Sequence, residues 1–277
     1  MTNKEIRAKA LSHMEGKWGT MIALTVFKVT FIIGWILVEA LLWLLFEHFG
    51  IEYSFTPAFL FTTHFGRFMM AIRLLIVFFV VNPESYILHR IFLDLYAGRN
   101  YSETRRYIQH NTRAIHPRAT LSMALPMMLR IITLLPLLVS SYGIYYWAFR
   151  RRADALTTSG LFVFMVSIGF TLVWAGVFIH YSISLSMTKY IMLLNPRANV
   201  FDACDLSVRI MDGHHTQYIF FVLSFVRFLP LLLTFYPVFG IEPYYKMCKL
   251  AFAESIMGKY WQDKYPAMIQ RWNKYAR

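Results

Sequence analysis

The stretch LTVFKVTFIIGWIL, from Leu24 to Leu37, decides the fold class of this chain. It lies inside an apolar run from about residue 20 to residue 46, longer than the roughly 20 helical residues that cross the hydrocarbon core of a bilayer. The run holds a single cation, Lys28, and it is too long for a strand in a protein core. We therefore expect a transmembrane helix here.

Four further apolar stretches follow, at about 59–81, 119–149, 159–187 and 217–257. The last one is long enough for one span with a surface helix, or for a tight hairpin of two spans at 217–235 and 237–257. Hydrophobic residues make up 57% of the chain and charged residues 16%, against about 45–50% and about 25% in ordinary soluble domains. These features predict an all-α, polytopic membrane helix bundle.

The distribution of positive charge favours six spans over five. A net charge of +13 would indicate a nucleic-acid partner in a soluble protein, but the cytoplasmic loops of membrane proteins collect Lys and Arg. With six spans and both termini in the cytoplasm, the cytoplasmic segments hold 18 basic residues and the outer segments hold 3, all at 150–152. With five spans, the basic C-terminal tail would face outward instead.

Residues 1–19 are predicted to form an amphipathic interfacial helix. Thr2 and Glu5 have the spacing of a capping box, in which each side chain bonds to the other residue's backbone N–H. Ile6 and Met14 share one face of this helix, with most of the lysines off that face. This pattern is typical of a helix lying on the cytoplasmic membrane surface.

The tail, residues 258–277, is predicted to be a cytoplasmic anchor. It interleaves five aromatic residues with five basic ones. Such a composition can bind nucleic acid, but next to a membrane it favours contact with anionic lipid headgroups. Membrane lipids are accordingly the expected partners, and nucleic acid is not.

Two segments of the chain resemble each other. Residues 10–24 align with 207–221, which places Met14 on Met211 and Gly16 on Gly213. Each segment reads as an amphipathic helix, a glycine and the start of a span. Internal duplication, which is common in transporters, and chance similarity both remain open explanations.

Motifs at the two ends resemble a bacterial family of integral membrane proteins catalogued as domain of unknown function 975. They are Arg7-x-x-Ala10-Leu11, Gly16-x-Trp18, Met211-x-Gly213, Phe220-x-x-Leu223-Ser224-Phe225 and Pro243-Tyr244. The resemblance implies a bacterial cytoplasmic (plasma) membrane protein, and it implies no activity. Arg227 and the pair His214-His215 depart from the family pattern.

Several cations fall within the predicted spans, and they are the candidate anion or lipid-headgroup ligands: Lys28, Arg67, Arg73, Arg130 and Arg227. Counted from the predicted cytoplasmic ends, all but Arg67 lie at a similar depth of roughly 12–17 Å. They are expected either to line one inward-facing basic cavity, or to snorkel and pair with the candidate counter-ions Glu39 and Glu242.

Polar residues at the cytoplasmic side carry a weaker signal. Asp202, Asp205 and Asp212 lie near His214 and His215, but no known metal-binding spacing is met, so a solvated helix face is the preferred interpretation. His180 is interpreted as a partner in a helix–helix hydrogen bond rather than as part of a proton relay. We predict no metal, no cofactor and no catalytic residue.

Three functions are compatible with these features. The leading one is a non-enzymatic protein that binds or transports an anionic amphiphile, such as a phospholipid or a lipid-linked phosphate, at a basic intramembrane cavity. The others are a structural or accessory subunit of a membrane complex and a membrane-embedded lipid-modifying enzyme.

Overall fold

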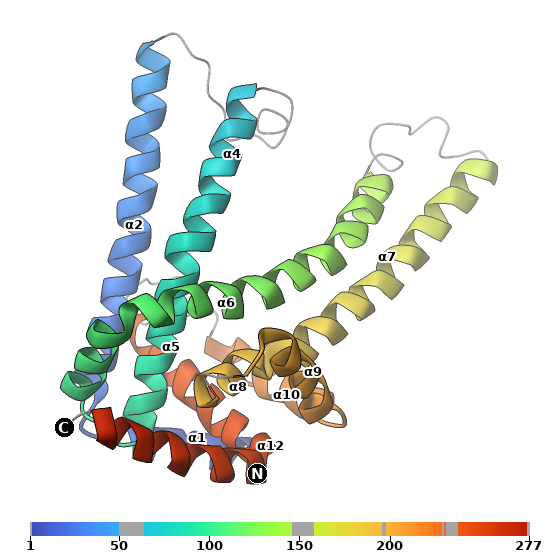
Figure 1. The fold of residues 1–277 in the computed structure, drawn as a ribbon. Coiled ribbons are helices and arrows are strands. Elements are labelled where there is room, and N and C mark those ends of the chain that lie inside the picture. Colours follow the sequence, from blue (N-terminus) through green and yellow to red (C-terminus); the bar gives the residue numbers. More distant parts are fainter. Residues whose placement is uncertain are drawn as a thin grey trace. The chain divides into compact units, whose positions relative to one another are not determined.

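The computed structural model describes residues 2–49, 64–145, 158–195, 198–228, 230 and 238–275 (Figure 1). All regular elements in these ranges are helices: α1 (Asn3–Met14), α2 (Trp18–His48), α4 (His64–Ile76), the π-helix η1 (Val77–Val81), α5 (Asn82–Tyr96), α6 (Tyr101–Tyr145), α7 (Thr158–Ser184), the 3₁₀-helix η4 (Leu185–Met187), α8 (Thr188–Leu194), α9 (Val200–Met211), α10 (His215–Leu223), the 3₁₀-helix η5 (Val226–Phe228) and α12 (Val238–Tyr275).

The described part of the chain is all-helical and has the long apolar helices of a membrane protein. It contains four helical segments long and apolar enough to cross a membrane: Trp18–His48, Gly66–Tyr96, Ala119–Tyr145 and Gly160–Leu194. They correspond in order to the first four predicted spans. The arginine run 150–152, the expected hairpin turn at 236–237 and the side chains of the tail beyond 258 lie outside the described residues.

The second span differs from the sequence-based expectation at its inner end. The pair Asn82-Pro83 was expected to end the helix, yet η1 leads without a break into α5, which continues to Tyr96. Proline breaks a helix by lacking an N–H and by crowding the preceding turn. The π-turn loosens that preceding turn, and Pro83 then sits in the first turn of α5, where its missing N–H costs little.

The chain divides into two compact units. Unit 1 comprises Met1–Thr120 and Val222–Arg277, and unit 2 comprises Leu121–Phe221.

In unit 1, α1 packs along α12 (Figure 1). Its predicted apolar face, with Ile6 and Met14, is buried, so this face meets protein and not the bilayer surface. Lys9 Nζ lies 2.8 Å from a carboxylate oxygen of Glu254 on α12. The predicted capping box is confirmed, because the Thr2 side chain accepts from the Glu5 N–H and Glu5 accepts from the Thr2 N–H. The N-terminal helix is therefore an integral part of unit 1.

In unit 2, α7 continues through η4 into α8, and η4 and α8 pack against α9. The Ser207 hydroxyl on α9 donates to the Ser184 carbonyl oxygen at 2.6 Å, where α7 gives way to the 3₁₀ turn. The same hydroxyl accepts from the Met187 N–H at 3.2 Å. One buried serine thus satisfies both backbone groups that the change of helix type would leave unpaired.

The two segments that resemble each other in sequence have the same local structure. Gly16 and Gly213 have φ angles of 73° and 76°, and both follow a residue with ψ near 130°. In each turn the N–H after the glycine bonds to the carbonyl of the preceding methionine at 2.9 Å. Aligned residues of the two segments are also buried together, in the pairs Ile6 and Ala203, Ala10 and Ser207, Met14 and Met211, Met21 and Tyr218, and Leu24 and Phe221. This match favours duplication over chance.

Candidate functional site

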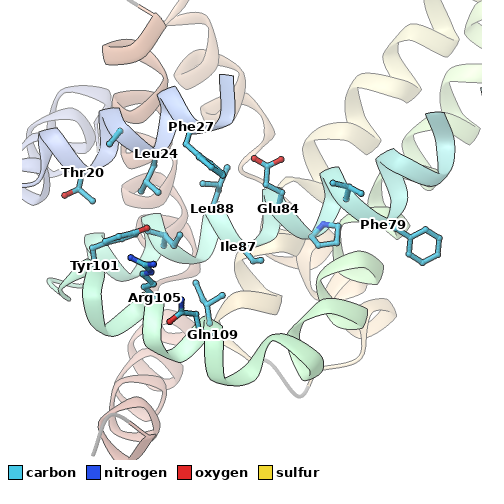
Figure 2. Close-up of a pocket in the computed structure, with 15 residues that line it drawn as sticks. Thr20, Leu24, Phe27, Phe79, Glu84, Ile87, Leu88, Tyr101, Arg105 and Gln109 are labelled. Atoms are coloured by element: carbon cyan, nitrogen blue, oxygen red, sulfur yellow. The ribbon is translucent and has the colours of Figure 1, made fainter. Parts of the chain in front are cut away.

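Unit 1 contains a groove of about 690 Å³ between α2, the η1–α5 segment and the first turns of α6 (Figure 2). This volume falls within the range of about 300–1,000 Å³ that is usual for ligand sites. Its walls are mostly apolar, with Leu24 and Phe27 from α2, and Ile87, Leu88 and Ile91 from α5. The end of α5 lies beside the start of α2, where Lys17 Nζ donates to the Leu95 carbonyl oxygen at 2.6 Å, and the chain then continues into α6.

One end of the groove opens onto surface that faces lipid. Phe27, Phe79 and Val80 line it, and their side chains are 63%, 53% and 41% exposed. All three belong to candidate membrane spans, where an exposed large apolar side chain contacts acyl chains. The apolar wall of the groove is therefore continuous with the lipid-facing surface of the two spans.

The other end of the groove is polar. Thr20, Tyr101, Arg105 and Gln109 line it, and Figure 2 shows Thr20, Tyr101 and Arg105 on the side away from Phe79. Thr20 is two residues after the first residue of α2, Trp18, or about 3 Å along the helix axis, which places it at the membrane–water boundary. Among the described residues, Arg105 makes no ion pair, so its guanidinium is available to an anionic group there.

A charge cluster adjoins the groove on the α5 side. Glu242 on α12 accepts from Lys28 at 2.7 Å and lies 3.0 Å from Lys246 Nζ. Glu84, which lines the groove, is attracted by the positive charges of Lys28 and Lys246. Glu242 is thus paired with both lysines, while the buried Oε1 of Glu84 has no hydrogen-bond partner among the described residues.

The structure places Lys28 and Arg73 in two separate ion pairs. Lys28 pairs with Glu242, and Arg73 Nε pairs with Glu39 Oε1 on α2. Lys28 and Glu39 are eleven residues apart on one helix, which corresponds to about 16 Å along its axis. Within unit 1 the two cations therefore lie at different heights along α2, and the helix of the second span continues past Val81 to Tyr96.

The other three candidate cations have different surroundings. Arg67 is exposed on α4. Arg227 is exposed on η5, with its guanidinium carbon 4.8 Å from the centre of the Phe228 ring. Arg130 belongs to unit 2, where one of its terminal nitrogens donates to the Ser182 carbonyl oxygen at 3.3 Å. Because Arg130 lies in the other unit, the single basic cavity expected from sequence stays a prediction.

The aspartates near the cytoplasmic histidines lie on the surface of unit 2. Asp202, Asp205 and Asp212 are exposed, and Asp205 pairs with Arg209 one turn further along α9. Within the described ranges, no group of three or more His, Cys, Asp or Glu side chains could hold a metal ion.

His180 makes a helix–helix contact by stacking. Its ring lies parallel to that of His215, with centroids 4.5 Å apart. His215 Nε2 is 2.9 Å from the Ser184 hydroxyl. Burial is the main cause that lowers the pKa of His215, and the nearby His180 lowers it further.

Sequence reasoning missed the polar end of the groove, since Arg105 and Tyr101 were not among the candidate ligands. Two signals pointed to them. The run SETRRY carries adjacent arginines, and the residues before it have an amphipathic pattern that includes Ile87 and Ile91, both of which line the groove.

No family model, curated protein or solved structure matches this chain. The resemblance to the domain of unknown function 975 family therefore stays a prediction, and the functional argument rests on the site itself.

Proposed function

We propose that this protein binds an anionic amphiphile of the phospholipid type, with an acyl chain in the α2–α5–α6 groove and the phosphate at Arg105. The observation that carries the proposal is the groove's polarity: an apolar trough open to lipid at Phe27 and Phe79, with a guanidinium at its other end. Arginine matches phosphate oxygens with two parallel hydrogen bonds. Thr20, Tyr101 and Gln109 add further polar contacts for a headgroup.

The depth of the groove supports a lipid occupant. Thr20 lies at the start of the first span, and Phe27 lies seven residues later, about 10 Å deeper along α2. A phospholipid in a leaflet has the same arrangement, with its phosphate at the boundary and its chain running inward. A water-soluble anion would bind the polar end without needing the apolar trough.

We also propose that the groove serves binding without a chemical step, and that the chain has six spans in the bacterial cytoplasmic membrane with both termini in the cytoplasm. The match between the α1–turn–α2 and α9–turn–α10 segments supports the fifth span, because α10 begins as α2 does. The burial of Met247, Leu250 and Ala251 reflects the packing of α12 on α1, α2 and α5 in unit 1; its role as a sixth span is part of the proposal, because α12 is not among the four described segments apolar enough to cross a membrane.

The test is lipid retention by the full-length protein purified in mild detergent. Ala23→Trp fills the groove from α2, and Arg105→Gln removes the cation at its polar end. Leu41→Trp, at a 65% exposed position of the same helix outside the groove, and Arg106→Gln, beside Arg105, are the matched controls.

Native mass spectrometry should show about one anionic phospholipid bound to the wild type and to both controls. Ala23→Trp should lose it, and Arg105→Gln should shift the bound lipid from anionic to neutral species. Equal retention of the same lipids by all five proteins would reject the proposal and favour an accessory subunit that packs on a partner.

A further inference from the structure

Arg130 is embedded in unit 2 and makes no ion pair with a described carboxylate of that unit. It is eleven residues into the third candidate span, Ala119–Tyr145, or about 16 Å along the axis, near the middle of a hydrocarbon core of about 30 Å. One terminal nitrogen donates to the Ser182 carbonyl oxygen. The Nε atom is buried and has no hydrogen-bond partner in the described part of the chain.

The described residues of unit 2 supply no counter-ion for this guanidinium. Its acidic side chains there are Asp202, Asp205 and Asp212, and all three are exposed on α9 or at its end. The two cations paired within unit 1 differ in this respect, since Lys28 and Arg73 each contact a carboxylate. A charged residue at the centre of a span is costly unless an opposite charge or a polar group satisfies it.

Unsatisfied hydroxyl groups accompany the arginine. The Oγ atoms of Ser182 and Ser186 are buried and have no partner among the described residues. The two serines are four positions apart, so they share one face where α7 passes into η4. Ser182 is the residue whose carbonyl Arg130 contacts, and Tyr218 lies near enough to interact electrostatically with the guanidinium.

We propose that unit 2 holds a small inorganic monoanion of the size of chloride, bound by the Nε–H of Arg130 and the hydroxyls of Ser182 and Ser186. The buried donors without a described partner are one charged N–H and two neutral O–H groups, and together they suit one negative charge. The depth argues against a lipid phosphate, because a headgroup at the boundary does not reach the middle of the span. The site is independent of the unit 1 groove, which has its own arginine.

The test is anion-dependent stability of the full-length protein in detergent at constant ionic strength. Sodium gluconate is replaced stepwise by sodium chloride, and the apparent Tm is recorded. A bound anion stabilises the folded state by mass action, so the wild type should show a saturating rise of a few degrees. Sodium sulfate and added phosphatidylglycerol are the comparison arms, and neither should reproduce this rise.

Arg130→Gln should abolish the chloride response, while Arg227→Gln, at an exposed arginine on η5, should keep it. Ser182→Ala combined with Ser186→Ala removes only two oxygen atoms, and it should shift the chloride midpoint at least tenfold upward even if the arginine variant does not fold. Binding of radiolabelled chloride should follow the same order.

The proposal is overturned if the wild type shows no saturating response, or if the double serine variant keeps the wild-type midpoint. A response to phosphatidylglycerol alone would also overturn it and assign Arg130 to lipid contact. Lipid retention at the groove is measured separately, so either proposal can fail without the other.

Discussion

The ion pair between Arg73 and Glu39 joins two candidate spans, and its removal gives a quantitative test of how this protein tolerates intramembrane charge. The two side chains are only 24% and 15% exposed. We consider Arg73→Gln, Glu39→Gln and the double variant. Each single change leaves one charge without its partner inside a span, whereas the double change leaves two neutral amides that can bond to each other.

The expected magnitudes follow from burial. A lone charge near the centre of a helix costs about 2.5–3.5 kcal/mol on insertion scales, so each single variant should lose about 2–3 kcal/mol. The double variant should lose less than the sum, which gives a coupling energy of about 2 kcal/mol. The control is the pair Arg209–Asp205 on α9, whose side chains are 75% and 62% exposed. Coupling in such exposed helical pairs is about 0.3–0.5 kcal/mol.

Equilibrium unfolding in mixed detergent micelles, followed by tryptophan fluorescence, supplies the free energies for both cycles. The single variants should unfold earlier than the double variant. A coupling energy for Arg73 and Glu39 no larger than that of the α9 control would refute the assignment of this pair to the membrane interior.

Two further predictions concern the shared turn and the stacked histidines. Gly16→Ala and Gly213→Ala should each lower the free energy of unfolding by about 1 kcal/mol, because both glycines have positive φ. Gly19→Ala, within α2, is the control and should not destabilise the protein. Denaturation midpoints measure these effects, and equal losses at all three sites would contradict the prediction. The lowered pKa of His215 means that its stabilising contribution is complete above the unfolded value of 6.5 and is lost as the pH falls below it. The Tm should therefore fall as the pH is lowered from 7.5 to 5.5, and His215→Asn should make the Tm less dependent on pH. If the variant shows the same pH dependence as the wild type, the contact between His215 and His180 is not its cause.

The four candidate spans and the first helix were predictable because their signals are local. A long apolar run such as the one around 24–37 can satisfy its backbone hydrogen bonds in a membrane only as a helix. Thr2 and Glu5 form a helix cap within four residues of the chain. The glycines at 16 and 213 likewise mark turns that require positive φ.

The inner end of the second span was not predictable, because Asn82-Pro83 is an ordinary signal for the end of a helix. A π-turn before the proline allows the helix to continue, and the residues Val77–Val81 contain no sequence signal that predicts this π-turn. The depth predicted for Arg73 was counted from that helix end, so a different helix end gives Arg73 a different depth.

The groove could not be derived from sequence because its lining comes from three helices. Leu24, Ile87 and Arg105 are separated by tens of residues and meet only through tertiary packing. A basic residue beside an amphipathic segment indicated a membrane surface, but the volume between the helices depends on how α6 lies against α5.

The most direct test of the account is photocrosslinking with a phosphatidylglycerol that carries a diazirine on its acyl chain. After irradiation in liposomes, peptide mapping should place the main adducts on the groove walls, around Leu24, Phe27 and Ile91, and Ala23→Trp should abolish them. A specific lipid site would be contradicted if the adducts spread evenly over lipid-exposed positions, such as Phe162 and Val173 on α7, and if Ala23→Trp left them unchanged.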